Sequence, residues 1–214
     1  MYGLKPQSIN TFCLQWAGMI ALALLAYNAK ASGVSALDQL IKQLNQFDQL
    51  HLRYEQVTLG DSTDSTSGEF FLQRPAQFKL LPDDDGAVVL SDGRTLWTQD
   101  DLLAQVTAQP LDAVSTFSPA RLMLMSLPEM DAAFEVQFSG DDEFSFLLTP
   151  RDERELIRNV GIVFEAQVPV QITLVSRANQ SVRVDLTVIS VNQTISNDTF
   201  IVEIGDGVDF VDYR

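Results

Sequence analysis

The sequence predicts a mainly β protein in which a long antiparallel sheet curves around a few short helices. From Leu50 onward, apolar and polar residues alternate with a period of two in one run after another, as in half-buried strands. Turn-forming clusters such as Ser139-Gly140-Asp141-Asp142 separate these runs at hairpin intervals. A sheet of so many strands curls, and at least two helices carry strong apolar faces. We therefore expect the helices to cover part of the concave face.

Residues 1–31 have the pattern of a secretory signal peptide. Lys5 supplies positive charge, an apolar run spans residues 12–27, and a small-x-small cleavage pattern ends at Ala31. We expect cleavage there, which leaves residues 32–214 as a single domain. An uncleaved anchor is the alternative, but the run is short for a bilayer span and contains a glutamine.

Cysteine usage and charge limit the possible locations and partners. The only cysteine, Cys13, lies in the predicted leader and is not preceded by the small residues of a lipoprotein cleavage box. An exported chain without disulfides suits a bacterial periplasm. Loss of the leader removes Lys5 and Lys30 and leaves 12 basic against 29 acidic residues, a formal net charge of −17. So acidic a surface argues against nucleic acid or anionic headgroups as partners.

The first elements of the predicted domain are a helix and two strands. An apolar stripe with i, i+3, i+4, i+7 spacing begins at Leu37, after Ser35 at a capping position and with Asp38 near the positive end of the helix dipole. The alternating strand from Leu50 follows. We expect "GDSTDSTSG" to be a polar turn and "EFFLQRPAQFKLL" to be the next strand.

A hairpin and a second helix come next. Ser91-Asp92-Gly93 separates "AVVL" from "TLW", and Asp-Gly between apolar runs is a strong hairpin signal. "LLAQVTAQPL" supplies another strand. In "SPARLMLMSL", Ser118 occupies a cap position and Pro119 the first helical position. From Phe134 onward we expect strands in six further runs: "FEVQF", "EFSFLLTP", "NVGIVFEA", "VPVQITLVS", "SVRVDLTVISV" and "TFIVEIG".

The predicted mature chain offers few groups for catalysis or metal binding. Its one histidine is His51, and without a second histidine or a cysteine the common zinc and cysteine-nucleophile motifs are excluded. The pairs Asp83-Asp84 and Asp141-Asp142 could support glycosidase chemistry, but they lie in turn-like segments where solvation explains them. We expect no enzymatic activity, no metal and no cofactor.

Several runs occur in a characteristic order between Gly68 and Arg121. They are "GEFFLQRPAQFKL", "VVLSDGRTLWTQDDLLAQVTAQPL" and "SPARLML", followed by "FSFLLTPRD" and a terminal "GVDFVD". Together they resemble the periplasmic outer-membrane lipoprotein carrier protein (LolA) family. With the leader and the first helix, the resemblance covers nearly the whole chain.

The resemblance implies an incomplete β-barrel whose hydrophobic cavity is covered by short lid helices. Family members carry lipoproteins across the periplasm from an inner-membrane ABC-type releasing complex to an outer-membrane receptor lipoprotein. Because this chain lacks a lipobox, it resembles the soluble carrier, which we expect to be a monomer and to hold acyl chains of its cargo. A periplasmic lipid or glycolipid shuttle, or a lipid-sensing regulator of the same fold, is the alternative.

The resemblance also points to individual residues. Phe70 and Leu72 share a strand face with Arg74, and we expect this face to line the concave side. In the family the arginine before the proline reaches across the cavity to backbone carbonyls of the lid, which implies that Arg74 is a latch. A guanidinium suits the free carbonyls at helix ends. The alternative is a rim arginine with its charge in solvent.

Other residues are assigned to the cavity and the lid. Leu122, Met123 and Met125 are expected on the lid, where thioethers adapt to a variable ligand, although ordinary core is the alternative. Phe78 is the candidate for the cavity mouth, or else it caps the sheet edge. Trp97 is assigned to the cavity, with ordinary sheet core equally open because turn parity does not settle its face.

The chain departs from the family pattern at three places. Leu80 stands where many members have tryptophan, Gly205-Asp206-Gly207 replaces the usual proline before "GVD", and the hairpin "SRANQSVRV" replaces a more usual Asp-x-x-Gly-Gln turn. These departures leave the cargo range and the docking to partners open.

Overall fold

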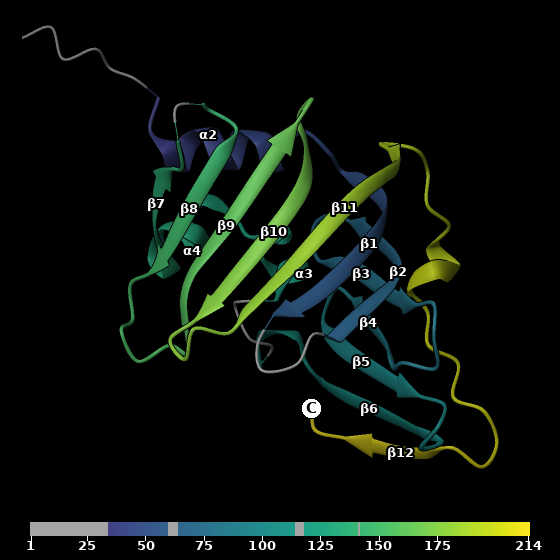
Figure 1. The fold of residues 1–214 in the computed structure, drawn as a ribbon. Helices are drawn as coiled ribbons and strands as arrows, with labels where there is room; N and C mark the ends of the chain where they lie inside the picture. Colours follow the sequence, from purple (N-terminus) through teal and green to yellow (C-terminus); the bar gives the residue numbers. More distant parts are fainter. Residues whose placement is uncertain (1–33, 60–63, 114–117, 141) are drawn as a thin grey trace, which may run out of the picture. The chain divides into compact units, whose positions relative to one another are not determined.

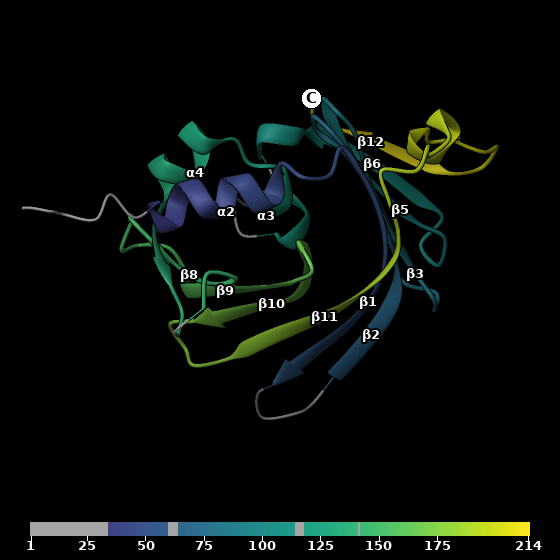
Figure 2. The ribbon, with the colours of Figure 1, turned by 90° about the horizontal axis from the view of Figure 1, so that it is seen from above.

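In the segments that the structure describes, twelve strands form one curved sheet with the α-helices on its concave side (Figures 1 and 2). The computed structural model describes residues 34–59, 64–113, 118–140 and 142–214. The chain divides into two compact units, Met1–Val34 and Ser35–Arg214, and every element described below belongs to the second. The predicted signal peptide lies outside the described residues.

The elements follow one another along the chain with short connections. The helices are α2 (Ala36–Leu44), η1 (Leu111–Ala113), α3 (Pro119–Leu124), α4 (Leu127–Ala133) and η2 (Asn197–Phe200). The strands are β1 (Gln49–Leu59), β2 (Asp64–Gln73), β3 (Gln77–Pro82), β4 (Val88–Asp92), β5 (Thr95–Asp100), β6 (Gln105–Pro110), β7 (Phe134–Phe138), β8 (Ser145–Pro150), β9 (Ile157–Glu165), β10 (Val168–Ser176), β11 (Ser181–Val191) and β12 (Asp209–Asp212).

The sheet order is β12-β6-β5-β4-β3-β2-β1-β11-β10-β9-β8-β7. Neighbouring strands are antiparallel except β12, which runs parallel to β6. The edge strands β7 and β12 do not pair, so the sheet curls without closing into a barrel. Figure 2 shows it bent around α2, α3 and α4, which lie on its concave side. The predicted curved, incomplete barrel with covering helices is confirmed.

Alternation along the central strands determines which side chains enter the core. Leu50 of β1 pairs with Leu72 of β2, which pairs with Phe78 of β3, and all three side chains are buried. Successive residues of a strand face opposite sides, so this row lies on the concave face together with Leu52 and Phe70. Burying each such side chain contributes roughly 1.5–3 kcal/mol.

Helix α2 covers one part of this concave face. The Ser35 hydroxyl caps it by accepting from the Asp38 N–H at 3.0 Å, as predicted. Leu40 and Leu44 are fully buried, and Phe47 follows them into the same cluster just beyond the helix.

Three predicted elements differ in the structure. Strand β2 begins at Asp64, inside the segment expected to be a turn. "EFFLQRPAQFKLL" forms two strands, because the chain turns at Arg74-Pro75-Ala76, where proline has no N–H to continue the ladder. "TFIVEIG" is not a strand: η2 occupies its start, capped by the Ser196 hydroxyl, and buries Phe200.

Helix α4 was not predicted. It spans only seven residues, so it has no apolar period long enough to recognise. Its start does carry a capping-box signal in the sequence, because Glu129 stands three residues after Ser126, with Pro128 in the first turn. The Glu129 carboxylate accepts from the Ser126 N–H at 2.8 Å.

Gly68 of β2 stands where a side chain would collide with the backbone of β3. A Cβ there would lie 2.2 Å from the Leu81 carbonyl oxygen and 2.8 Å from the Pro82 Cα. We predict that Gly68→Ala lowers the free energy of unfolding by about 2 kcal/mol, because backbone must move.

Urea denaturation followed by circular dichroism measures this loss. Gly161→Ala is the matched control in β9, where the nearest atom to the new Cβ is Thr173 Cβ at 3.7 Å, an ordinary contact. Equal effects of the two substitutions would contradict the argument.

Candidate binding cavity

An apolar cavity of about 140 Å³ lies between the concave face of the sheet and helix α3. The sheet supplies aromatic and aliphatic side chains from β1, β2, β3 and β11. They are Tyr54, Phe70, Leu80, Val184 and Leu186. The start of α3 closes the other side with Ser118, Pro119, Ala120 and Met123, and Gln56 and Thr66 complete the lining.

Local sequence explains why a short helix forms over the cavity. The Ser118 hydroxyl accepts from the Arg121 N–H at 3.1 Å, and Pro119 stands in the first turn, both as predicted. The Arg121 guanidinium then pairs with the Glu129 carboxylate of α4 at 2.7 Å. This pair connects α3 to the next helix.

The Arg74 side chain joins α3 to α2 and to the sheet. Its Nη2 donates to the Met123 carbonyl in α3 at 2.9 Å and to the Leu44 carbonyl at the end of α2 at 2.5 Å. Its Nε donates to the Phe47 carbonyl at 3.0 Å, and the guanidinium lies 5.5 Å from the centre of the Phe47 ring. One side chain thus binds three carbonyls from two segments that are far apart in the sequence.

The physical basis of this contact is the shortage of donors at helix C-termini. The last carbonyls of a helix have no partner within it, and the negative end of the helix dipole favours a cation there. Burial lowers the pKa of Arg74 from its ordinary value, and the charge of Asp48 opposes this shift. The guanidinium stays charged at neutral pH.

The other predicted cavity and lid residues lie in two environments. Phe70 and Met123 line the cavity. Leu72, Phe78, Leu122 and Met125 are buried in the main core and do not line the cavity. Leu72 and Phe78 form the neighbouring row of the sheet.

Trp97 lies on the opposite face of the sheet, so its assignment to the cavity is corrected. Its neighbour Leu96 points into the main core, and alternation turns Trp97 away from it. The indole N–H donates to Asp92 Oδ2 at 2.9 Å, and the ring stacks on Phe210 of β12 at 6.1 Å between centroids. The Arg214 guanidinium lies 5.1 Å from the Trp97 ring centre.

Several lining residues were not predicted as site residues. Tyr54 continues the alternation of Leu50 and Leu52, so its face could have been derived from the sequence. Val184 and Leu186 could not, because only the pairing of β11 with β1 brings them to the cavity.

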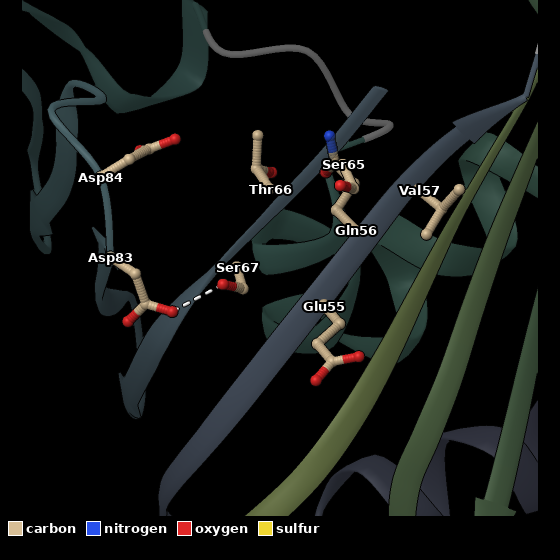
Figure 3. Close-up of a pocket in the computed structure, with 8 residues that line it drawn as sticks. All are labelled: Glu55, Gln56, Val57, Ser65, Thr66, Ser67, Asp83 and Asp84. Carbon is tan, nitrogen blue, oxygen red and sulfur yellow. Dashed lines mark hydrogen bonds between the residues drawn. The ribbon is translucent and has the colours of Figure 1, made fainter. Parts of the chain in front are cut away.

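A second, polar hollow of about 350 Å³ lies along the β1–β2 hairpin (Figure 3). We call it the polar notch, and it is lined by Glu55, Gln56, Val57, Ser65, Thr66, Ser67, Asp83 and Asp84. Gln56 and Thr66 contribute to both linings, but Glu55, Val57, Ser65 and Ser67 alternate with them, so the polar notch opens mainly on the convex face of the sheet.

Asp83 closes one side of the polar notch by accepting from the Ser67 hydroxyl at 2.6 Å and from Arg53. The Ser67 hydrogen bond lowers the pKa of Asp83, partial desolvation opposes this, and Arg53 lowers it further. Asp83 and Asp84 are both exposed and follow the end of β3, so the pair lies at a turn, as predicted.

These features define a half-open β-sheet protein with a covered apolar cavity, the general form of a carrier for apolar ligands. The sequence matches the family described as outer membrane lipoprotein carrier protein LolA over residues 45–203, and the chain belongs to this family. Within the described segments no helix is long and apolar enough to cross a bilayer.

Individual relatives agree with this assignment. The outer-membrane lipoprotein carrier protein of Hahella chejuensis is 29% identical over 203 residues, covering 92% of this chain and 97% of the relative. That of Pseudomonas aeruginosa is 26% identical, covering 89% and 94%. An uncharacterized conserved protein from Thermus thermophilus shares the fold, with a TM-score of 0.52 at 8% identity and coverage of 83% and 96%.

The Arg74 contacts predict the behaviour of Arg74→Leu. The substitution leaves the carbonyls of Leu44, Phe47 and Met123 without this donor, so we expect the free energy of unfolding to fall by about 2 kcal/mol. We also expect amide hydrogen exchange to accelerate in α3. Arg94→Leu, at an exposed turn position, is the control and should change neither quantity. Unaltered exchange in α3 of the Arg74 variant would contradict the prediction.

Proposed function

We propose that this protein is a periplasmic chaperone that binds acyl chains of lipoproteins released from the inner membrane and delivers them to an outer-membrane receptor. The observation that carries the proposal is the apolar cavity between the sheet and α3. Relatives named as outer-membrane lipoprotein carrier proteins support it. Burying an acyl chain is worth about 0.8 kcal/mol per methylene, so lipidated cargo needs such a space while it crosses water.

The cavity is small for this ligand, which indicates a closed form. Its volume of about 140 Å³ is close to that of an engineered cavity that holds one benzene molecule. A long acyl chain therefore requires α3 to move away from the sheet. The Arg74–Met123 hydrogen bond has to break in that movement, and in this sense Arg74 is a latch.

The energy of this hydrogen bond is small enough for the latch to open and close reversibly. A hydrogen bond to a charged group contributes about 1.5–3 kcal/mol. Contact with two to four methylenes would offset it, at about 0.8 kcal/mol each. When cargo leaves, the bond forms again and lowers the free energy of the empty carrier. Closure therefore favours release, and no separate energy source is needed on this protein.

The location and the partners follow from the same proposal. Residues 1–31 act as a signal peptide that is removed near Ala31, and residues 32–214 form the monomeric, non-enzymatic carrier domain in the periplasm of a Gram-negative bacterium. An inner-membrane ABC-type complex supplies the lipoprotein, and a receptor lipoprotein of the outer membrane accepts it. The acidic surface disfavours nucleic acid as a partner.

The first test is to incubate the mature protein with spheroplasts of a Gram-negative host and to examine the supernatant by native mass spectrometry. We expect a complex with an acylated lipoprotein. Ala120→Phe should reduce its yield several-fold, because the new ring fills the cavity from α3. Ala132→Phe, on the exposed face of α4, is the matched control. Recovery of free lipid alone would favour a lipid shuttle and refute lipoprotein carriage.

The second test addresses the latch. We predict that Arg74→Leu still takes up lipoprotein but hands it to the receptor less completely, because the empty form no longer gains the latch hydrogen bonds. The measurement is the fraction of labelled lipoprotein transferred to purified receptor, compared with Arg94→Leu. Transfer equal to that of the wild type would remove the latch from the mechanism.

A further inference from the structure

The lining of the concave face changes from apolar to polar along the β1–β2 hairpin. Along β1 the inward positions are Leu52, Tyr54 and Gln56, and the register pairs them with Phe70, Gly68 and Thr66 of β2. The cavity is thus aliphatic and aromatic at one end and carries a phenol, an amide and a hydroxyl at the other.

These three polar groups have no protein partner in the described part of the chain. No hydrogen bond engages the side chains of Tyr54, Gln56 or Thr66 there, although all three line the cavity. Tyr54 is only 9% exposed, and the space over its hydroxyl depends on glycine: a Cβ on Gly68 would come within 2.8 Å of that oxygen. Among the described residues no side-chain nitrogen or oxygen is both fully buried and without a hydrogen-bond partner, so these three groups are open to water and free to bind a ligand.

The position of these groups also limits what they can bind. Gln56 and Thr66 are half-buried and stand at the end of the apolar cavity where the polar part of a ligand would meet water. Asp84 and Asp83 lie close enough to Tyr54 for their charges to raise its pKa. Carboxylates near this end repel a phosphate or a free carboxylate, so they favour a ligand whose polar part has no negative charge.

We propose that Tyr54, Gln56 and Thr66 form a binding subsite for the carbonyl oxygens of ester or amide groups that join acyl chains to their carrier molecule. The chains occupy the apolar part of the cavity, and the linkage lies against the three donors. The subsite rests on the proposed function, because it requires an acylated ligand. It adds selection for neutral acyl linkages over free fatty acids and phospholipids.

The chemistry of the donors suits this ligand. Ester and amide carbonyls accept hydrogen bonds, and phenol, hydroxyl and amide N–H groups donate them. Burial and the negative charges of Asp84 and Asp83 raise the pKa of Tyr54, so its hydroxyl remains a donor at neutral pH.

The test uses two synthetic lipopeptides that differ only at the linkage. One carries an ester-linked dipalmitoylglyceryl group on its N-terminal cysteine, and the other carries the dihexadecyl ether analogue, which lacks the carbonyls. Binding of each to the mature protein is measured by displacement of a fluorescent lipid probe. We expect the wild type to prefer the ester by about threefold to tenfold for each hydrogen bond made.

The variants separate the subsite from general binding. Tyr54→Phe and Thr66→Val should each reduce the preference for the ester and leave the affinity for the ether unchanged. Tyr213→Phe, exposed near the C-terminus, and Thr187→Val, on the convex face of β11, are matched controls that should keep the full preference.

Two outcomes would overturn the inference, and they can be told apart. Equal binding of ester and ether to the wild type, with no effect of either variant, refutes the subsite and leaves the carrier function intact. Failure of both lipopeptides to bind refutes the carrier function, and the subsite with it.

Discussion

The binding of three backbone carbonyls by the Arg74 guanidinium is the interaction on which the covered cavity depends. The Leu44 carbonyl ends α2, the Phe47 carbonyl lies just beyond that helix and the Met123 carbonyl belongs to α3, and a single planar group binds all three. The backbone N–H of Arg74 donates to the Asp48 carbonyl at 2.8 Å, so the turn that carries the side chain is itself fixed. Few other side chains offer several donors in such fixed geometry.

The concave side of the sheet combines a packed part with a hollow part. Beneath α2, fully buried side chains such as Leu40, Leu44 and Phe47 fill the space, and this part behaves as an ordinary core. Beneath α3, the lining residues leave a cavity. Helix α3 is shorter than α2, and its movement has to break the Arg74–Met123 hydrogen bond and uncover buried side chains such as Leu122 and Leu124.

The polar end of the cavity gives a bound molecule a preferred orientation. Apolar side chains lie at its inner end, whereas Gln56 and Thr66 lie at its half-exposed end. An acylated molecule placed here has its chains inside and its polar linkage at the exit. Access to solvent at this end also keeps the attached part of the cargo outside the sheet.

Much of the fold follows from local sequence. Alternation from Leu50 onward gives the strands, the Asp-Gly turn at Asp92 gives a hairpin, and Ser35 and Ser118 give the helix starts, because hydrogen bonding within a few residues decides each of them. The role assigned to Arg74 came from the family resemblance. The face of Trp97 was decided by tertiary structure, since β12 pairs with β6 and brings Phe210 to the indole. The cavity itself also depends on long-range pairing: β11 meets β1 over about 130 residues of chain, and no local pattern records which strands become neighbours.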